Sequence, residues 1–165
     1  MSQEDRKYSN KFDSSFMEKA IRQAKIACEL GEVPVGAVIV KDGTLLAESH
    51  NLTGSMTDPT AHAEVSAIRD ACRTVGDFSL AGSVIYTTCE PCPMCLGAIW
   101  WARIETIYFA SDRDDAARIG FDDAALYREV SLALPDRQLP LVRHHVAAAD
   151  QLMEDWLKKE DKIRY

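Results

Sequence analysis

Apolar residues recur at helical spacing near both ends of the chain. Between residues 16 and 28 they fall every three or four positions, which predicts an amphipathic helix, and Gly31 provides a natural stop. Ser15 and Glu18 have the spacing of a capping box at the start of that helix. Residues 147–163 repeat the pattern and predict a terminal amphipathic helix.

Short runs of apolar and β-branched residues predict the strands. Asp42 and Gly43 form a strong hairpin signal between two of these runs, so those two are expected to pair antiparallel. The five predicted strands are residues 35–40, 44–49, 83–88, 105–110 and 139–146.

Helical stretches alternate with these strands. Residues 61–75 and 91–103 each predict a helix, and residues 124–130 predict a short one after the polar segment 111–123. A strand, a helix and a strand in succession imply a right-handed parallel crossover. The elements together predict an α/β fold, a three-layer α/β/α sandwich with a mixed sheet of about five strands.

The composition favours a cytoplasmic protein that acts on a small molecule. Residues 1–13 contain no apolar run and are expected to form a disordered lead, which leaves residues 14–165 as a single domain. No stretch of about 18 apolar residues occurs, so we expect no membrane span. The net charge is −7 and basic residues are interspersed with acids, which disfavours a nucleic-acid partner. Cys28 and Cys72 fall on apolar helix faces, and the five cysteines form no disulfide framework, which fits a reducing cytoplasm.

Two cysteines and one histidine carry the candidate chemistry. Cys92 and Cys95 are three positions apart, so in a helix that starts near Pro91 both thiols point the same way from its first turn. A helix N-terminus favours thiolate over thiol. Together with His62 they provide three ligands suited to zinc, and a catalytic zinc keeps its fourth position for water. Glu64, two residues from His62, is the obvious group to take a proton from that water.

Two other interpretations of the cysteines remain. A structural zinc site usually has four protein ligands, and Cys89 or His50 offers a fourth. A redox-active Cys-x-x-Cys is less favoured, because prolines flank the cysteines and a His-x-Glu accompanies them.

The order His-x-Glu followed by Pro-Cys-x-x-Cys resembles the signature of the zinc-dependent nucleobase deaminases, in the cytidine/deoxycytidylate deaminase superfamily. Residues 58–64 are similar in both the bacterial guanine deaminases and the tRNA adenosine deaminases, and residues 33–38 look more like the tRNA enzymes. The later half resembles the bacterial guanine deaminases, whose chains end in a charged segment closing on tyrosine. That part of the resemblance rests on residues 101–103, 115–117, 120–123, Tyr127 and Tyr165.

This resemblance implies an enzyme of cytidine-deaminase-like fold that hydrolyses guanine to xanthine and ammonia. It implies one Zn²⁺ per subunit, held by His62, Cys92 and Cys95, with Glu64 as the catalytic proton shuttle. It also implies a homodimer in which the C-terminal segment is exchanged between the two subunits. The remaining roles are that Asn51 binds the purine edge, that Asp123 contacts the guanine amino group and assists proton transfer, and that Ala63, Trp101 and Tyr165 complete the substrate site.

The residues themselves leave simpler roles open at four of these positions. Asp123 precedes a helical stretch and suits an N-cap. Trp101 suits core packing, and Tyr165 suits a frayed end. Asn51 follows a strand and suits a turn.

Val35 departs from the guanine deaminases, which tend to have at this position a phenylalanine that stacks on the base. The roomier pocket keeps other substrates open: adenosine in a tRNA anticodon loop, another aminopurine, cytosine or a triazine. A zinc-stabilised binding module that has lost its chemistry is disfavoured, because Glu64 is intact.

Overall fold

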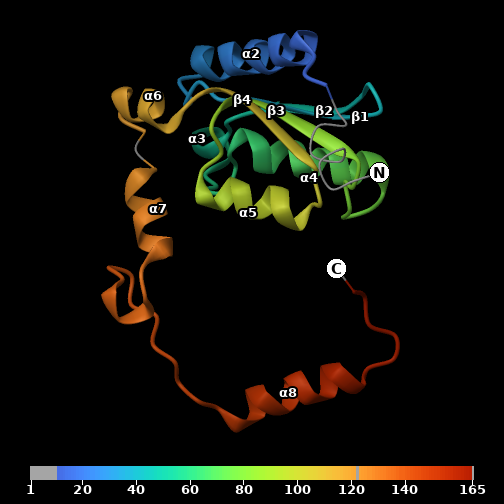
Figure 1. The fold of residues 1–165 in the computed structure, drawn as a ribbon, viewed down its shortest axis with the longest axis vertical. Helices are drawn as coiled ribbons and strands as arrows, with labels where there is room; N and C mark the ends of the chain where they lie inside the picture. Colours follow the sequence, from blue (N-terminus) through green and yellow to red (C-terminus); the bar gives the residue numbers. More distant parts are fainter. Residues whose placement is uncertain (1–10, 122, 165) are drawn as a thin grey trace. The chain divides into compact units, whose positions relative to one another are not determined.

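The computed structural model describes residues 11–121 and 123–164, and its contacts divide the chain into two units that meet between Ala125 and Leu126. The first unit is a sheet with helices on both faces (Figure 1). The predicted N-terminal lead falls largely on residues 1–10, which lie outside the described residues.

The sheet has four strands in the order β2-β1-β3-β4. Their bounds are β1 Gly36–Lys41, β2 Thr44–His50, β3 Ser83–Cys89 and β4 Thr106–Ser111. Strand β1 pairs antiparallel with β2 and β3, whereas β3 pairs parallel with β4. The hairpin at Asp42 and Gly43 and the parallel crossover are therefore confirmed, and so is the mixed α/β architecture.

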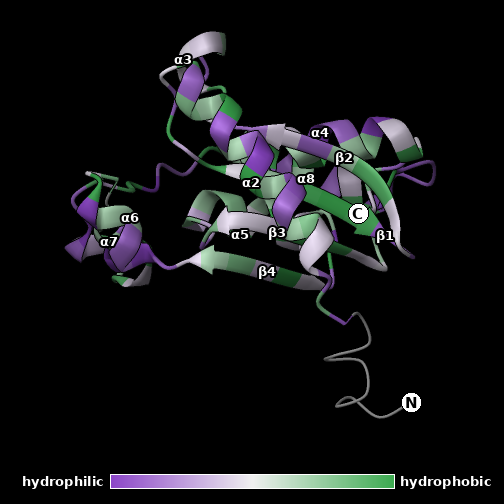
Figure 2. Ribbon diagram, turned by 90° about the horizontal axis from the view of Figure 1, so that it is seen from above, coloured by the Kyte–Doolittle hydropathy of each residue, from purple (hydrophilic) through white to green (hydrophobic). Residues whose placement is uncertain are grey.

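Alternate side chains of β1 supply two separate hydrophobic clusters, one on each face of the sheet. Ala37 and Ile39 pack with the helices α4 (Ala63–Val75) and α5 (Pro93–Trp101). Val38 and Val40 pack with helix α2 (Ser14–Glu29) on the opposite face. Because both faces are covered, β1 is hydrophobic along its length, as Figure 2 shows, in contrast to the half-polar helix α2.

Helix α2 begins two residues earlier than its capping box predicts. Asp13 is the N-cap, and its side chain accepts a hydrogen bond of 2.9 Å from the Ser15 backbone N–H. The Asp13 backbone N–H in turn donates to the Tyr86 hydroxyl, at 3.2 Å, which ties the helix start to strand β3. The hydrogen bond to Tyr86 therefore favours Asp13 rather than Ser15 as the N-cap residue of α2.

The polar segment 111–123 contains a helix that the hydrophobic pattern did not predict. Helix α6 (Arg113–Arg118) starts at a capping box formed by Asp112 and Asp115, which is an acidic variant of the usual serine and glutamate pair. Only Ala116 is buried along this helix, so no apolar stripe marks it in the sequence.

The second unit contains most of helix α7 (Ala124–Ser131), the 3-10 helix η1 (Leu134–Asp136) and helix α8 (Ala147–Lys158). The predicted fifth strand, residues 139–146, is wrong: the segment is irregular. Leu139 and Val142 are 71% and 85% exposed, so the apolar pattern that predicted a strand has no sheet to join within this chain. The described residues contain no helix that is both long and apolar enough to cross a membrane.

Gly36 is the point where α2 lies closest to the sheet. A Cβ at this position would collide with the Ala20 carbonyl oxygen and would lie 2.6 Å from the Ala24 backbone nitrogen. Both obstacles are helix backbone, so no side-chain rotation relieves them.

We therefore expect Gly36→Ala to destabilise the protein by about 2 kcal/mol, roughly 4–8 °C in Tm, because it forces α2 away from β1. Thermal unfolding followed by circular dichroism measures the change. Thr44→Ala, at an exposed position of β2, is the matched control and should stay within about 0.5 kcal/mol of the wild type. Equal Tm values for the two variants would contradict the close contact.

Candidate functional site

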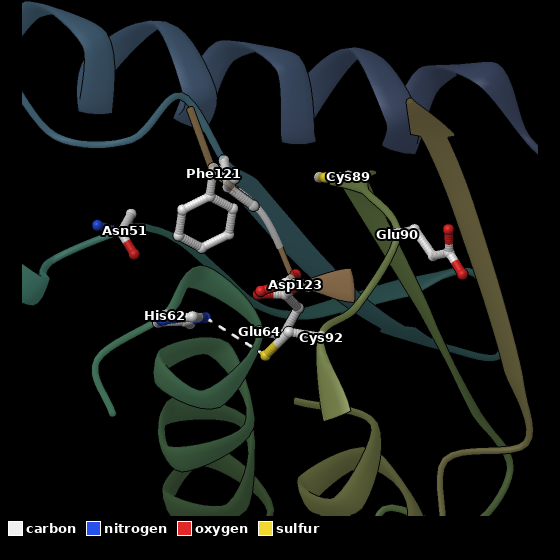
Figure 3. Close-up of a pocket in the computed structure, with 9 residues that line it drawn as sticks. Asn51, His62, Glu64, Cys89, Glu90, Cys92, Phe121 and Asp123 are labelled. Carbon is white, nitrogen blue, oxygen red and sulfur yellow. Dashed lines mark hydrogen bonds between the residues drawn. The ribbon is translucent and has the colours of Figure 1, made fainter. Parts of the chain in front are cut away.

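The starts of helices α4 and α5 bring the three predicted metal ligands together. His62 and Cys92 are the N-cap residues of α4 and α5, and Cys95 lies in the first turn of α5. The His62 Nδ1 atom is 3.7 Å from the Cys92 Sγ and 3.6 Å from the Cys95 Sγ (Figure 3 shows the first of these contacts). One donor atom from each residue lies within 4.8 Å of the others, which is close enough to share one ion.

Local sequence fixes these positions. Pro93 occupies the first turn of α5, where its missing N–H costs no hydrogen bond. Before α4, the Asp58 carboxylate accepts hydrogen bonds from the Thr60 backbone N–H and hydroxyl, at 2.8 and 2.7 Å, and so closes the turn. Leu52 then donates its N–H to the Ala61 carbonyl at 2.9 Å, which sets the chain direction as it reaches His62.

Two cysteines this close together do not both remain thiols. Hydrogen bonding from Cys95 and then from His62 lowers the pKa of Cys92 to about 4, and the bond that Cys95 makes to the Cys92 sulfur raises the pKa of Cys95. The bond with Cys92 also raises the pKa of His62. The cluster thus already carries a thiolate beside an imidazole.

This donor set fits zinc. Two sulfurs and one imidazole nitrogen are borderline-soft ligands, and three protein ligands leave one position for water. Neither Cys89 nor His50 belongs to the cluster among the described residues, and the His50 Nδ1 lies 2.9 Å from Gln23 Oε1 instead. Among the described residues, the cluster thus has three protein ligands and no fourth from Cys89 or His50.

Glu64 lies beside the ligands and is 3% exposed. The Thr87 hydroxyl and the Cys95 thiol donate to its two carboxylate oxygens, each at 3.4 Å. Burial raises its pKa, which favours the protonated carboxyl over the carboxylate. A buried carboxyl next to a metal cluster is suited to proton transfer.

The cluster opens into a cavity that gathers most of the predicted site residues. Figure 3 shows that they come from the loop after β2, the starts of α4 and α5, and the segment after α6. The lining residues are Val35, Asn51, His62, Glu64, Cys89, Glu90, Cys92, Phe121 and Asp123. Asn51 is buried just after the end of β2. Asp123 also lines the cavity, although it follows Glu64 by 59 positions in the sequence.

Three predicted site residues are not brought into this cavity. Ala63 is fully buried at the start of α4, and its side chain is part of the hydrophobic cluster under the sheet. Trp101 is 59% exposed at the end of α5, where the Arg103 guanidinium lies 5.6 Å from its ring centre. Tyr165 lies outside the described residues.

Phe121 is a lining residue that the sequence analysis did not assign to the site. Its ring centre is 5.8 Å from that of His62. Gly120 has a φ of +86°, so the chain reverses after α6, and the Phe121 N–H donates to the Ala116 carbonyl at 3.1 Å. A glycine directly before an aromatic residue and an acidic pair was the available signal.

Glu90 anchors the same segment. Arg113, at the start of α6, donates from its backbone N–H and its Nε to the Glu90 carboxylate, each at 3.1 Å, and also from its Nη2. These bonds lower the pKa of Glu90. The pair fastens the loop before α5 to the helix that precedes Phe121 and Asp123.

Residues 10–111 match the profile of the cytidine and deoxycytidylate deaminase zinc-binding region. The chain is 41% identical to the guanine deaminase of Bacillus subtilis over 156 residues, which covers 92% of this chain and 97% of that relative. The crystal structure of the Bacillus subtilis guanine deaminase superposes with a TM-score of 0.89 at 40% identity, covering 93% of this chain and 99% of that one.

Similarity to a second group is shorter. The tRNA-specific adenosine deaminase of Aquifex aeolicus is 48% identical over 96 residues, which covers 58% of this chain and 64% of that relative.

A solved guanine deaminase from Nitrosomonas europaea is 25% identical with a TM-score of 0.64, covering 68% of this chain and 65% of that chain.

The purified chain is expected to hold one zinc ion per polypeptide. Cys92→Ala should weaken zinc binding by more than about 100-fold, because it removes one of three protein ligands. Cys89→Ser is the matched control, since Cys89 lines the cavity but does not belong to the ligand cluster. The measurement is the zinc content of each variant after dialysis against a weak chelator. Equal zinc loss in Cys92→Ala and Cys89→Ser would contradict the three-ligand site and indicate that Cys89 is also a ligand.

Proposed function

This chain belongs to the cytidine and deoxycytidylate deaminase family, and from that membership we propose that it hydrolyses guanine to xanthine and ammonia. The observation that carries the proposal is the extent of the similarity: the relative matched over nearly its whole length is a guanine deaminase. Asp123 supports it, because this carboxylate lies in the cavity beside the zinc ligands, where an exocyclic amino group can donate to it.

His62, Cys92 and Cys95 hold the zinc in this proposal. When bound, zinc lowers the pKa of a water molecule toward 7 and so supplies hydroxide at neutral pH. The protein contributes a buried site: Cys92 and Cys95 are both buried, and both would be thiolates when they hold zinc, so that their two negative charges would balance those of the divalent cation.

Glu64 is the proton shuttle. It takes one proton from the attacking water and gives it to the ring nitrogen beside C2 of guanine, while the water oxygen forms a bond to C2. It then takes the remaining proton of the added hydroxyl group and passes it to the exocyclic amino group. The bond between C2 and the amino nitrogen breaks, and ammonia leaves. The Thr87 hydroxyl, at 3.4 Å, holds the carboxylate in the orientation that serves both transfers.

The base lies between the two walls of the cavity. Asn51 binds the purine edge and Asp123 accepts from the amino group, as the family resemblance implies. Phe121 provides the aromatic face that Val35 lacks, because both residues line the cavity and the Phe121 ring stands next to the His62 imidazole. Trp101 and Tyr165 complete the substrate site in the assembled protein, as the family resemblance implies, whereas the Ala63 side chain stays in the hydrophobic cluster.

Deamination of adenosine in tRNA is the second candidate. It is favoured by the 48% identity to a tRNA-specific adenosine deaminase, but that similarity covers only 58% of this chain. The net charge of −7 also disfavours binding to a polyanion, since such binding relies on lysine and arginine.

We also propose that the working unit is a homodimer in which the second unit of each chain completes the domain of its partner. Helix α7, η1 and helix α8 contain no buried residue in the single chain, although α8 has a full apolar stripe. Trp100, on α5, is 75% exposed as well. Apolar surface of this extent is typical of an interface. None of the five cysteines forms a disulfide, which supports a cytoplasmic location for the assembly.

The function is tested by ammonia release from zinc-loaded protein offered guanine, guanosine, adenine, cytosine and an anticodon stem-loop RNA. We expect turnover of guanine alone. Glu64→Gln is the matched variant: it should retain zinc and lose about 10²–10⁴-fold in kcat, because the amide cannot carry a proton. Activity on the RNA without activity on guanine would overturn the assignment, and a fully active Glu64→Gln variant would reject the shuttle.

The dimer is tested by light scattering after gel filtration, where we expect twice the chain mass of 18.4 kDa. Trp100→Glu should shift the protein toward the monomer and lower its activity, because it puts a charge in the exposed apolar patch of α5. Lys25→Glu, at an exposed position of α2, should leave the mass unchanged. A wild-type protein that elutes at the monomer mass would remove the proposal.

A further inference from the structure

Glu32 is the hub of a hydrogen-bond network that reaches the cavity through Asn51. Its carboxylate accepts four hydrogen bonds. The Asn51 Nδ2 and the Gly54 N–H donate to Oε2, at 2.9 and 3.1 Å. The Ser55 N–H and hydroxyl donate to Oε1, at 2.6 and 2.8 Å. Glu32 touches none of the zinc ligands and does not line the cavity.

This network decides which way the Asn51 amide faces. A carboxylate accepts hydrogen bonds and cannot donate, so only the NH₂ end of the amide can face Glu32. The carbonyl oxygen must then point to the other side, where the Thr53 hydroxyl donates to it at 3.2 Å. Figure 3 shows this oxygen on the side of His62, with the amide nitrogen turned away from the cavity.

The charge of Glu32 is permanent under working conditions. Hydrogen bonds from Ser55 first, and then from Gly54 and Asn51, lower its pKa to about 2. At neutral pH Glu32 is therefore a carboxylate, which accepts the hydrogen bond from Asn51 and cannot donate one.

We propose that Glu32 is a positioning residue that holds the Asn51 carbonyl oxygen toward the cavity, so that the site takes a base through a ring N–H. The inference rests on the proposed function and adds to it the type of atom that Asn51 reads. A carbonyl oxygen has two lone pairs, and Thr53 uses one of them. The second lone pair of the Asn51 oxygen accepts a hydrogen bond from a ring N–H of the base. An unsubstituted purine base has such an N–H, whereas a base alkylated at that ring nitrogen does not.

A double-mutant cycle tests whether Glu32 acts through Asn51. We expect Glu32→Gln and Asn51→Ala each to lower kcat/KM for guanine by about tenfold or more. The glutamine side chain must turn its NH₂ group toward either Asn51 or Ser55. The Asn51 amide then no longer faces a carboxylate and is free to rotate. Combined with Asn51→Ala, the Glu32→Gln change should cost no more than a further twofold, because the residue through which it acts is absent.

Ser55→Ala is the matched control. It removes the hydroxyl bond to Oε1 and leaves the bond to Asn51 in place. We expect kcat/KM within about twofold of the wild type, even where Tm falls as much as it does for Glu32→Gln. This separates positioning from loss of stability.

A polarity swap provides the rescue. In Glu32→Gln combined with Asn51→Asp, the glutamine NH₂ can donate to the new carboxylate, which still presents an oxygen to the cavity. We expect this pair to exceed the Asn51→Asp single variant in kcat/KM by about tenfold, since the single variant sets two carboxylates against each other.

Additive losses in the cycle, or no loss in Glu32→Gln, would overturn the proposal, and so would a swap that fails to exceed Asn51→Asp. A wild-type protein that does not turn over guanine rejects the proposed function instead. The same cycle is then measured with whichever base of the panel it deaminates, so the two ideas fail separately.

Discussion

Everything at this site depends on two helices that start side by side. The N-caps of α4 and α5 are His62 and Cys92, and their side chains approach within 3.7 Å. The sheet enforces this approach, because α4 and α5 pack on the same face of β1 through one hydrophobic cluster. The distance between the ligands depends on how the two helices pack on this face of the sheet. The packing of small residues such as Ala63 and Ala67 against that face is therefore part of the chemistry.

The residues that the sequence revealed are those whose roles rest on local spacing. His62 and Glu64 are two residues apart, and Cys92 and Cys95 share one helical turn, so the pattern itself predicted a common site. The structure brings the three predicted ligands within 4.8 Å of one another. The hairpin and the parallel crossover were also predictable, because the turn signal at Asp42 and Gly43 and the succession of strand, helix and strand permit few other arrangements.

The residues that the sequence did not reveal act across long separations or without an apolar pattern. Glu32 reaches Asn51 across nineteen positions, and nothing in its neighbourhood marks it as more than a loop acid. Phe121 enters the cavity only because Gly120 reverses the chain. The error at residues 139–146 has a different origin. Apolar alternation predicts a surface that needs covering, and in this chain the cover is absent, so the segment stays irregular.

The residues of the site thus lie in two parts of the chain. Those proposed for the chemical step shared by the family lie in one part, and two of those proposed to select the base lie in the other. Zinc ligands and Glu64 lie within the region that matches the family profile, residues 10–111. Phe121 and Asp123 lie beyond it and reach the same cavity. Val35 lies within it and offers no aromatic face, whereas the Phe121 ring also lines the cavity. In the proposed function, the Phe121 ring, the Asp123 carboxylate and the Asn51 carbonyl oxygen face a flat base with several N–H donors, which describes guanine better than adenine or cytosine.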